Sequence, residues 1–214
     1  MICCCTKGAG AGRFFSHFAK RFRKRYEKHG FDQTQKQMIE GLERVGFKDA
    51  SLLEIGCGVG FLHQSLLEMG ASSATGIELS DTMLDEASKR AQEHGLETRT
   101  DYHMGDFVSM GDTLPSADIT LMDRVICCYP DADAMVHCSL EKTGRAYVLT
   151  IPRNLWYIRL GMAALNFMLL LVRSEFRGYI HNPELIDHWI IQKNYTRQYE
   201  NTTAVWLTRV YVTG

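Results

Sequence analysis

A glycine-rich turn at residues 54–60 constrains this chain more than any other part of its sequence. The apolar segment Ser51–Ile55 is predicted to be a short strand. It leads directly into Glu-Ile-Gly-Cys-Gly-Val-Gly, and a helix is predicted to begin at Phe61. Glycines let a backbone approach a ligand closely, and the unpaired N–H groups at the start of a helix can donate to that ligand. The pattern therefore predicts a strand–turn–helix unit that binds a ligand.

Strands and helices alternate on both sides of this turn. The predicted strands cover residues 51–55, 74–78, 98–104, 117–123 and 146–151, and the predicted helices cover 33–45, 61–69, 81–93 and 131–141. Such alternation indicates a parallel sheet with helices on both faces. After Pro152 the pattern changes to an apolar helix at 155–172, a helix at 183–192, and strands at 195–200 and 204–212 that are close enough in sequence to form a hairpin. The expected fold class is α/β.

The spacing of the glycines separates two classes of ligand. Dinucleotide-binding turns have the pattern G-x-G-x-x-G, with the helix N-terminus facing a pyrophosphate. Here the glycines are Gly56, Gly58 and Gly60, so the third comes one residue early and Phe61 takes its place. The carboxylate of Glu54 would repel a pyrophosphate and attract the ammonium group of a methionine moiety. The turn therefore favours S-adenosylmethionine over a nicotinamide dinucleotide.

Further polar and aromatic residues follow the predicted strands. An acid that ends the second strand is suited to a ribose, an acid–Phe pair after the third strand is suited to adenine, and an Asp-Arg pair ends the fourth strand. Ligands of open α/β sheets bind outside the carboxyl ends of the strands, so these residues are expected to form one adenosyl site. They are Glu78 with the adjacent Leu79, Asp106 with Phe107, and Asp123 with Arg124.

Four motifs resemble those of the class I S-adenosylmethionine-dependent methyltransferases: LLEIGCGVG, TGIELS, HMGDF and DITLMDRV, over roughly residues 31–150. Within that superfamily the chain is similar to the magnesium-protoporphyrin O-methyltransferase-like group in its Tyr129-Pro130, its Ile151-Pro152-Arg153 and its N-terminal helical extension. The resemblance implies a Rossmann-like, seven-stranded, mostly parallel sheet. Its last strand would be antiparallel, and helices would cover both faces.

The resemblance also implies S-adenosyl-L-methionine as cofactor and a position for each site residue. Glu54, Gly56, Gly58 and Gly60 would line the methionine end, with Cys57 in the loop as a small residue without a reactive role. Glu78 and Leu79 would lie at the ribose, Asp106 and Phe107 at the adenine, and Asp123 and Arg124 beneath the sulfonium. In-line transfer of a methyl group mainly requires alignment of the nucleophile. A base matters only for a protonated acceptor, and the candidates are Tyr129 and His137, followed by His17 and His181.

The chain has seven cysteines, an odd number that includes the consecutive Cys3–Cys5, and no apolar leader opens the sequence. Both features favour a cytoplasmic protein with free thiols. A cluster of Cys3–Cys5 with Cys127 and Cys128 would suit a soft metal or metalloid. Because the usual zinc spacing is missing, the favoured interpretation is that Cys127 and Cys128 are small core residues, and no metal site is expected.

Two segments that flank the motifs bear on the identity of the substrate. Residues 1–30 form a basic extension, in which aromatic residues at 14, 18, 22 and 26 predict one amphipathic helix. Residues 31–214 form the methyltransferase domain, with a hydrophobic, substrate-covering insertion near 154–192. The apolar run 155–172, interrupted by Arg159 and Asn166, favours a buried or covering helix over an interfacial segment, and an interfacial segment over a membrane span. Segments 13–28 and 155–172 together suggest peripheral contact with a membrane.

The favoured function is transfer of a methyl group to a small acceptor that is hydrophobic or membrane-associated. The alternatives are a non-catalytic protein that binds S-adenosylmethionine or associates with a membrane, and, less favoured, a nicotinamide-dependent oxidoreductase. The net charge of −1 gives no indication of a nucleic-acid partner. The sequence leaves the acceptor atom open among O, N, S and C.

Overall fold

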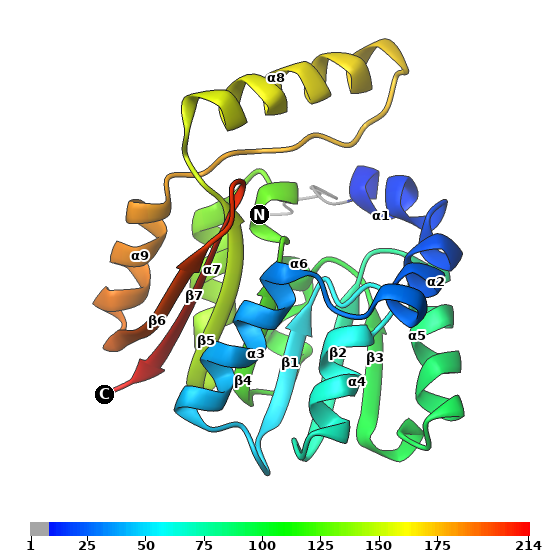
Figure 1. Cartoon of the computed structure of the whole chain (residues 1–214), viewed down its shortest axis with the longest axis vertical. Helices are drawn as coiled ribbons and strands as arrows, with labels where there is room; N and C mark the ends of the chain where they lie inside the picture. Colours follow the sequence, from blue (N-terminus) through cyan, green and yellow to red (C-terminus); the bar gives the residue numbers. More distant parts are fainter. Residues whose placement is uncertain (1–8) are drawn as a thin grey trace.

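The computed structural model describes residues 9–214 and contains a seven-stranded sheet with helices on both faces (Figure 1). Its order is β3-β2-β1-β4-β5-β7-β6. The strands are β1 Ser51–Ile55, β2 Ser73–Glu78, β3 Thr100–Met104, β4 Ala117–Asp123, β5 Thr143–Pro152, β6 Tyr195–Thr202 and β7 Trp206–Thr213. The helices are α1 Ala9–Ser16, α2 Ala19–His29, α3 Gln33–Val45, α4 Phe61–Glu68, α5 Asp81–Glu93, α6 Phe107–Met110, α7 Ala132–Glu141, α8 Trp156–Leu171 and α9 Pro183–Gln192.

The topology confirms the predicted fold class. Strands β1 to β5 pair in parallel, with Leu53 opposite both Thr75 and Thr120, whereas β7 runs antiparallel to β5 and β6. Since the carboxyl ends of the parallel strands lie at one end of the sheet, the turns after β1, β2, β3 and β4 gather there. In Figure 1, β1 points toward the end of the molecule where α1 lies.

Two apolar layers hold the helices to the sheet, because successive side chains of a strand point to opposite faces. Leu53 and Ile55 pack in one layer with residues of α7 and α9. Leu52 packs in the other layer, with Met38 of α3 and Leu66 of α4. The sheet is therefore buried on both faces, as parallel sheets usually are.

The N-terminal extension forms two helices, so the prediction of one continuous helix through Phe14–Tyr26 is wrong. Helix α1 ends at Ser16. The Ser16 hydroxyl donates a hydrogen bond to the Gly12 carbonyl and shares a second one, of 2.7 Å, with the Ser80 hydroxyl. A serine that bonds the carbonyl four residues back often bends a helix. The contact with Ser80 anchors the end of α1 beside the start of α5. In α2, Arg23 forms ion pairs with Glu86 and Glu93 of α5.

Helix α8 stands away from the sheet (Figure 1), and this differs from the favoured expectation of a buried helix. Only Ile158 and Leu169 of its side chains are buried, whereas Trp156 is 77% exposed and Leu171 is 67% exposed. Within residues 9–214, no helix combines the length and apolar character needed to cross a membrane.

Candidate functional site

The glycine turn requires its three glycines for different reasons. Gly56, Gly58 and Gly60 have φ angles of 67°, 53° and 74°, a region that side chains other than glycine rarely adopt. A Cβ atom at Gly56 would lie 2.7 Å from Val125, and one at Gly60 would lie 2.6 Å from Gln64, whereas one at Gly58 would meet open space. Gly56 and Gly60 therefore permit close packing, and Gly58 keeps a space empty.

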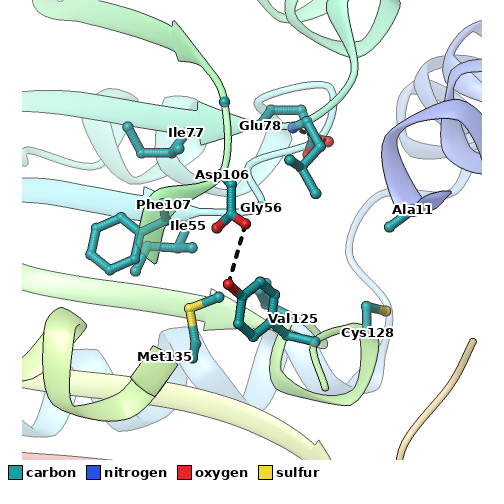
Figure 2. A pocket seen from close by; sticks show the side chains of 13 residues that line it. Ala11, Ile55, Gly56, Ile77, Glu78, Asp106, Phe107, Val125, Cys128 and Met135 are labelled. Carbon is teal, nitrogen blue, oxygen red and sulfur yellow. Dashed lines mark hydrogen bonds between the residues drawn. The ribbon is translucent and has the colours of Figure 1, made fainter. Parts of the chain in front are cut away.

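That space belongs to a cavity of about 340 Å³ between the glycine turn and the N-terminal helices. A second cavity of about 60 Å³ adjoins it at the ends of β2 and β3 (Figure 2). The residues that line both cavities are Ala11, Gly56, Glu78, Leu79, Val125 and Cys128. Together the two cavities form an elongated site, and Glu78 lies at the junction.

The structure brings nearly all of the predicted cofactor residues to these cavities. Glu54, Gly56, Cys57, Gly58, Glu78, Leu79, Asp123 and Arg124 line the larger one. Asp106 and Phe107 line the smaller one. Gly60 is not among the described residues that line either cavity, and a Cβ atom there would point at Gln64 of α4. The residues were predicted separately at the ends of four strands, and the fold assembles them.

The Glu78 carboxylate is held by backbone N–H groups. Oε2 accepts from the Gly58 N–H at 2.9 Å, and Oε1 accepts from the N–H groups of Leu79 and Ser80 at 2.8 and 3.1 Å. A carboxylate has about four acceptor positions, so Oε2 keeps one for a ligand hydroxyl. Burial raises the pKa of Glu78, although these three hydrogen bonds oppose the shift.

Asp106 and Tyr129 form the polar edge of the smaller cavity. The Tyr129 hydroxyl donates to Asp106 Oδ2 at 3.2 Å, the bond marked in Figure 2. Oδ1 of Asp106 accepts from the Val108 N–H and caps α6. The remaining lining is mostly apolar and includes Ile77 and Phe107. This arrangement suits a flat, apolar ring with a polar substituent at its edge.

A partly buried ion pair with several further partners lines the larger cavity. Arg124 binds Asp123 through two hydrogen bonds of 3.0 and 2.7 Å, and it also donates to Asp32 at 2.9 Å. Gln35 donates to Asp123 and to the hydroxyl of Tyr26. Burial raises the pKa of Asp123, and the charge of Arg124 opposes that shift. Arg124 thus donates three of its five N–H groups to carboxylates.

Glu54 is bound by a histidine that the sequence analysis did not select. The Glu54 carboxylate accepts from the backbone N–H of His63 at 3.2 Å and lies 2.5 Å from its Nδ1. The Nε2 atom of His63 contacts the Tyr102 hydroxyl at 2.9 Å. Burial raises the pKa of Glu54, whereas the hydrogen bond with His63 lowers it. Glu54 therefore joins β1 to α4 as well as lining the cavity.

The candidate bases do not lie in the larger cavity. His137 lies on α7 beside Trp189, His17 bonds the Arg13 carbonyl at the surface, and His181 contacts the Tyr129 carbonyl. None of these three is among the described residues lining a cavity. Burial, together with the neighbouring Asp106, raises the pKa of Tyr129, and this opposes its action as a base. The structure thus gives no support to the candidates Tyr129 and His137.

The cover of the larger cavity comes from the N-terminal extension. Phe15 of α1 and Phe22 and Tyr26 of α2 line it, together with Met83 and Trp206. No described residue of 154–192 lines either cavity. Leu169 and Phe176 pack instead in a cluster with Ala11 and Phe14 of α1, and Phe176 stacks on Phe14 with the ring centroids 4.8 Å apart. The insertion therefore packs against α1 without lining a cavity itself, and its substrate-covering role stays a prediction.

The charges around the larger cavity discriminate between ligands. The charged residues among its described lining are Glu54, Glu78, Asp123 and Arg124, and Arg124 is paired with two carboxylates. Like charges in a poorly solvated site repel strongly. Such a site favours a ligand that carries positive charge and disfavours a pyrophosphate. Cys127 and Cys128 also line this cavity, whereas Cys3–Cys5 lie outside the described residues.

Comparison with known proteins finds similarity to methyltransferases. A model of the methyltransferase domain matches residues 52–141. The ubiquinone biosynthesis O-methyltransferase of Pseudomonas paraeruginosa (strain DSM 24068 / PA7) is 28% identical over 150 residues, which cover 67% of this chain and 63% of that protein. Residues 52–141 therefore match the methyltransferase-domain family. The matched part spans less than two thirds of the length of this relative.

Solved structures show that this methyltransferase fold extends over the whole chain. The magnesium protoporphyrin IX methyltransferase from Synechocystis PCC 6803, crystallised with bound SAM, matches with a TM-score of 0.72 and 17% identity over 100% of both chains. The [4+2]-cyclase SpnF matches with a TM-score of 0.71 and 13% identity over 97% of both chains. At these identities the likeness concerns the fold alone, and the second match is named for a different reaction.

Proposed function

We propose that this chain binds S-adenosylmethionine across the two cavities and transfers its methyl group to a small, apolar acceptor. The observation that carries the proposal is the pair of adjoining cavities, which meet at Glu78 and whose walls have an excess of carboxylates. S-adenosylmethionine is elongated and carries positive charge at its sulfonium and ammonium groups. The site suits both its shape and its charge.

The ligand would occupy the site from Asp106 to Arg124. The adenine would lie in the smaller cavity, with its amine at Asp106, and a ribose hydroxyl would donate to the open position on Glu78 Oε2. The methionine part would follow the backbone of Gly56 and Gly58 into the larger cavity. A structure with S-adenosylhomocysteine tests this arrangement, and a ligand lying outside both cavities would contradict it.

The bound cofactor supplies an activated methyl group, and the protein mainly has to align the acceptor with it. Neither Glu54 nor Asp123 is free to remove a proton, because His63 and Arg124 respectively engage their carboxylates. No histidine is among the described residues that line the larger cavity. We therefore expect an acceptor whose nucleophilic atom needs no base from this part of the chain.

The apolar cover indicates the kind of acceptor. Phe15, Phe22 and Met83 line the larger cavity, and burial of an apolar acceptor against such side chains contributes about 25 cal/mol per Å². The similarity to a magnesium protoporphyrin IX methyltransferase and to ubiquinone biosynthesis O-methyltransferases is consistent with an apolar acceptor. The competing proposal is a protein that binds the cofactor without methyl transfer, and acceptor-dependent formation of S-adenosylhomocysteine distinguishes the two.

Affinity for S-adenosylmethionine should fall as the pH is lowered. Burial raises the pKa of Glu54, Glu78 and Asp123 in the empty site, and a cationic ligand favours their ionised forms. Binding should therefore release protons and strengthen as the pH rises through the raised pKa values. Calorimetry between about pH 5 and about pH 8, in buffers of different ionisation enthalpy, measures both effects. Affinity that increases on acidification would contradict the assignment.

We further propose that α8 lies on an anionic membrane surface. Its exposed apolar side chains include Trp156, Leu160, Phe167 and Leu171, and the sequence contains no acidic residue between Glu141 and Glu175. Exposed basic residues lie at Arg159 and Arg173. An apolar helix bordered by basic residues suits the boundary between head groups and acyl chains.

Sedimentation with vesicles tests this second proposal. Wild-type chain should sediment with phosphatidylcholine vesicles that contain phosphatidylglycerol, and replacement of Leu160, Phe167 and Leu171 by asparagine should reduce the bound fraction at least several-fold, because the apolar contact is lost. The matched control replaces Leu185 and Ile191, which are exposed on α9, and should bind as wild type does. Equal binding by both variants would refute the proposed role of α8.

A further inference from the structure

Two adjacent cysteines lie in the wall of the larger cavity, and the proposed methyl transfer makes no use of them. Cys127 and Cys128 belong to the short helical turn Ile126–Cys128 that follows β4. In such a turn successive side chains are separated by about 120°, whereas in a strand they would point to opposite faces. Both thiols therefore face the Arg124 carbonyl, at 3.2 and 3.6 Å, and their Sγ atoms are 3.8 Å apart.

This separation suits a single atom bound by both sulfurs. Two sulfurs at about 2.3 Å from one tetrahedral centre lie about 3.8 Å apart. A disulfide requires about 2.05 Å, so the two sulfurs would have to move much closer together to form one. Soft thiolate ligands prefer soft metals and metalloids. The two sulfurs are thus in contact with each other, and one soft atom can bind both.

The two thiols differ in their readiness to react. A hydrogen bond from Cys127 lowers the pKa of Cys128, and the same interaction, together with burial, raises the pKa of Cys127. Cys128 is also the more exposed of the two and lines both cavities. A reagent that enters the site would therefore meet Cys128 first and Cys127 second.

We propose that Cys127 and Cys128 form a dithiol site for a trivalent arsenical that carries one organic substituent. The described residues contain no group of three or more Cys, His, Asp or Glu side chains arranged to hold a metal ion, and such an arsenical needs only two sulfurs. It exchanges its two hydroxyl groups for the two thiol sulfurs and releases two waters. Arsenic stays trivalent, so no oxidant or reductant is required.

Occupation of this site should block the cofactor. Cys128 contributes to the walls of both cavities. It also lies close enough to Glu78 for the charge of that carboxylate to oppose part of the lowering of the pKa of Cys128. The substituent on arsenic would enter the space assigned above to S-adenosylmethionine. This part of the inference rests on the proposed function, whereas the binding of the arsenical does not.

Phenylarsine oxide is the probe, used with a full-length chain in which Cys3, Cys4 and Cys5 are replaced by serine. Intact-mass measurement should show one phenylarsenic group that survives excess glutathione and is removed by dimercaptopropanol. Cys127→Ala and Cys128→Ala should each reduce the fraction of chain that keeps its phenylarsenic group in glutathione at least tenfold. Cys138 is a free thiol outside the two cavities, so Cys138→Ala should leave this fraction unchanged. Peptide mapping of the parent chain gives the same assignment if a variant folds poorly.

Glutathione-resistant labelling that persists in the Cys127→Ala and Cys128→Ala variants, or that is absent from the parent, would overturn the proposal. Prior addition of S-adenosylhomocysteine should slow the labelling. Stable labelling of residues 127–128 at a rate that S-adenosylhomocysteine does not change would support the dithiol site and contradict the proposed position of the cofactor.

Discussion

Gly58→Leu is expected to abolish detectable binding of S-adenosylhomocysteine. Gly58 lines the larger cavity, and a Cβ atom there would meet open space, so we expect a leucine side chain to occupy the position proposed for the methionine part of the ligand. The φ of 53° at this residue adds a conformational cost of about 1–2 kcal/mol. Calorimetric titration measures the loss of binding, and thermal unfolding measures the cost in stability.

Gly95→Leu is the matched control for this substitution. Gly95 follows α5, has a φ of 65°, and a Cβ atom there also meets open space, but Gly95 is outside the described lining of both cavities. It should lose a similar amount of stability and retain affinity for S-adenosylhomocysteine. If both variants bind equally well, Gly58 does not border the ligand.

Glu78→Gln is expected to weaken S-adenosylhomocysteine binding by a factor of about 10 to 100. One acceptor position on Oε2 is open to a ligand hydroxyl, and a hydrogen bond to a charged group contributes about 1.5–3 kcal/mol. Removal of the charge also removes part of the attraction for the ligand's ammonium group. The unfolding temperature should fall as well, because the amide nitrogen of glutamine cannot accept the hydrogen bond that the Gly58 N–H donates to Oε2.

Glu86→Gln removes the same charge from another largely buried carboxylate. Glu86 pairs with Arg23 and Lys89 and is not among the described residues that line the cavities. We expect wild-type affinity from this control, with a small loss of stability. Equal loss of affinity in the two variants would point to a general charge effect rather than a contact with the ligand.

The sequence predicts the strand-end residues well because their signals are local. Glu78 and Asp106 each follow a strand in a short motif, and the parallel sheet necessarily brings such ends together. By contrast, Gln35 reaches Asp123 from a distant part of the chain. The only local signal was the capping pair Asp32 and Gln35, which marks the start of a helix and gives no indication of a site.

The failures in prediction have physical causes. The candidate bases rest on residue type alone and stay predictions, since a lone histidine such as His137 is as well suited to a helix surface as to a site. The buried His63 was missed because its partner Glu54 already had an explanation as a ligand contact. The apolar run 155–172 predicts a buried or covering helix, but only Ile158 and Leu169 of α8 are buried. The hydrophobicity of a segment does not show whether protein or another apolar surface contacts it.

The central claim is that the site takes a cationic adenosyl ligand rather than a dinucleotide, and calorimetric titration with S-adenosylmethionine and with NADH tests it most directly. The account predicts one site per chain for S-adenosylmethionine, with affinity that strengthens as the pH rises, and no binding of NADH under the same conditions. Saturable binding of NADH in place of S-adenosylmethionine would contradict it.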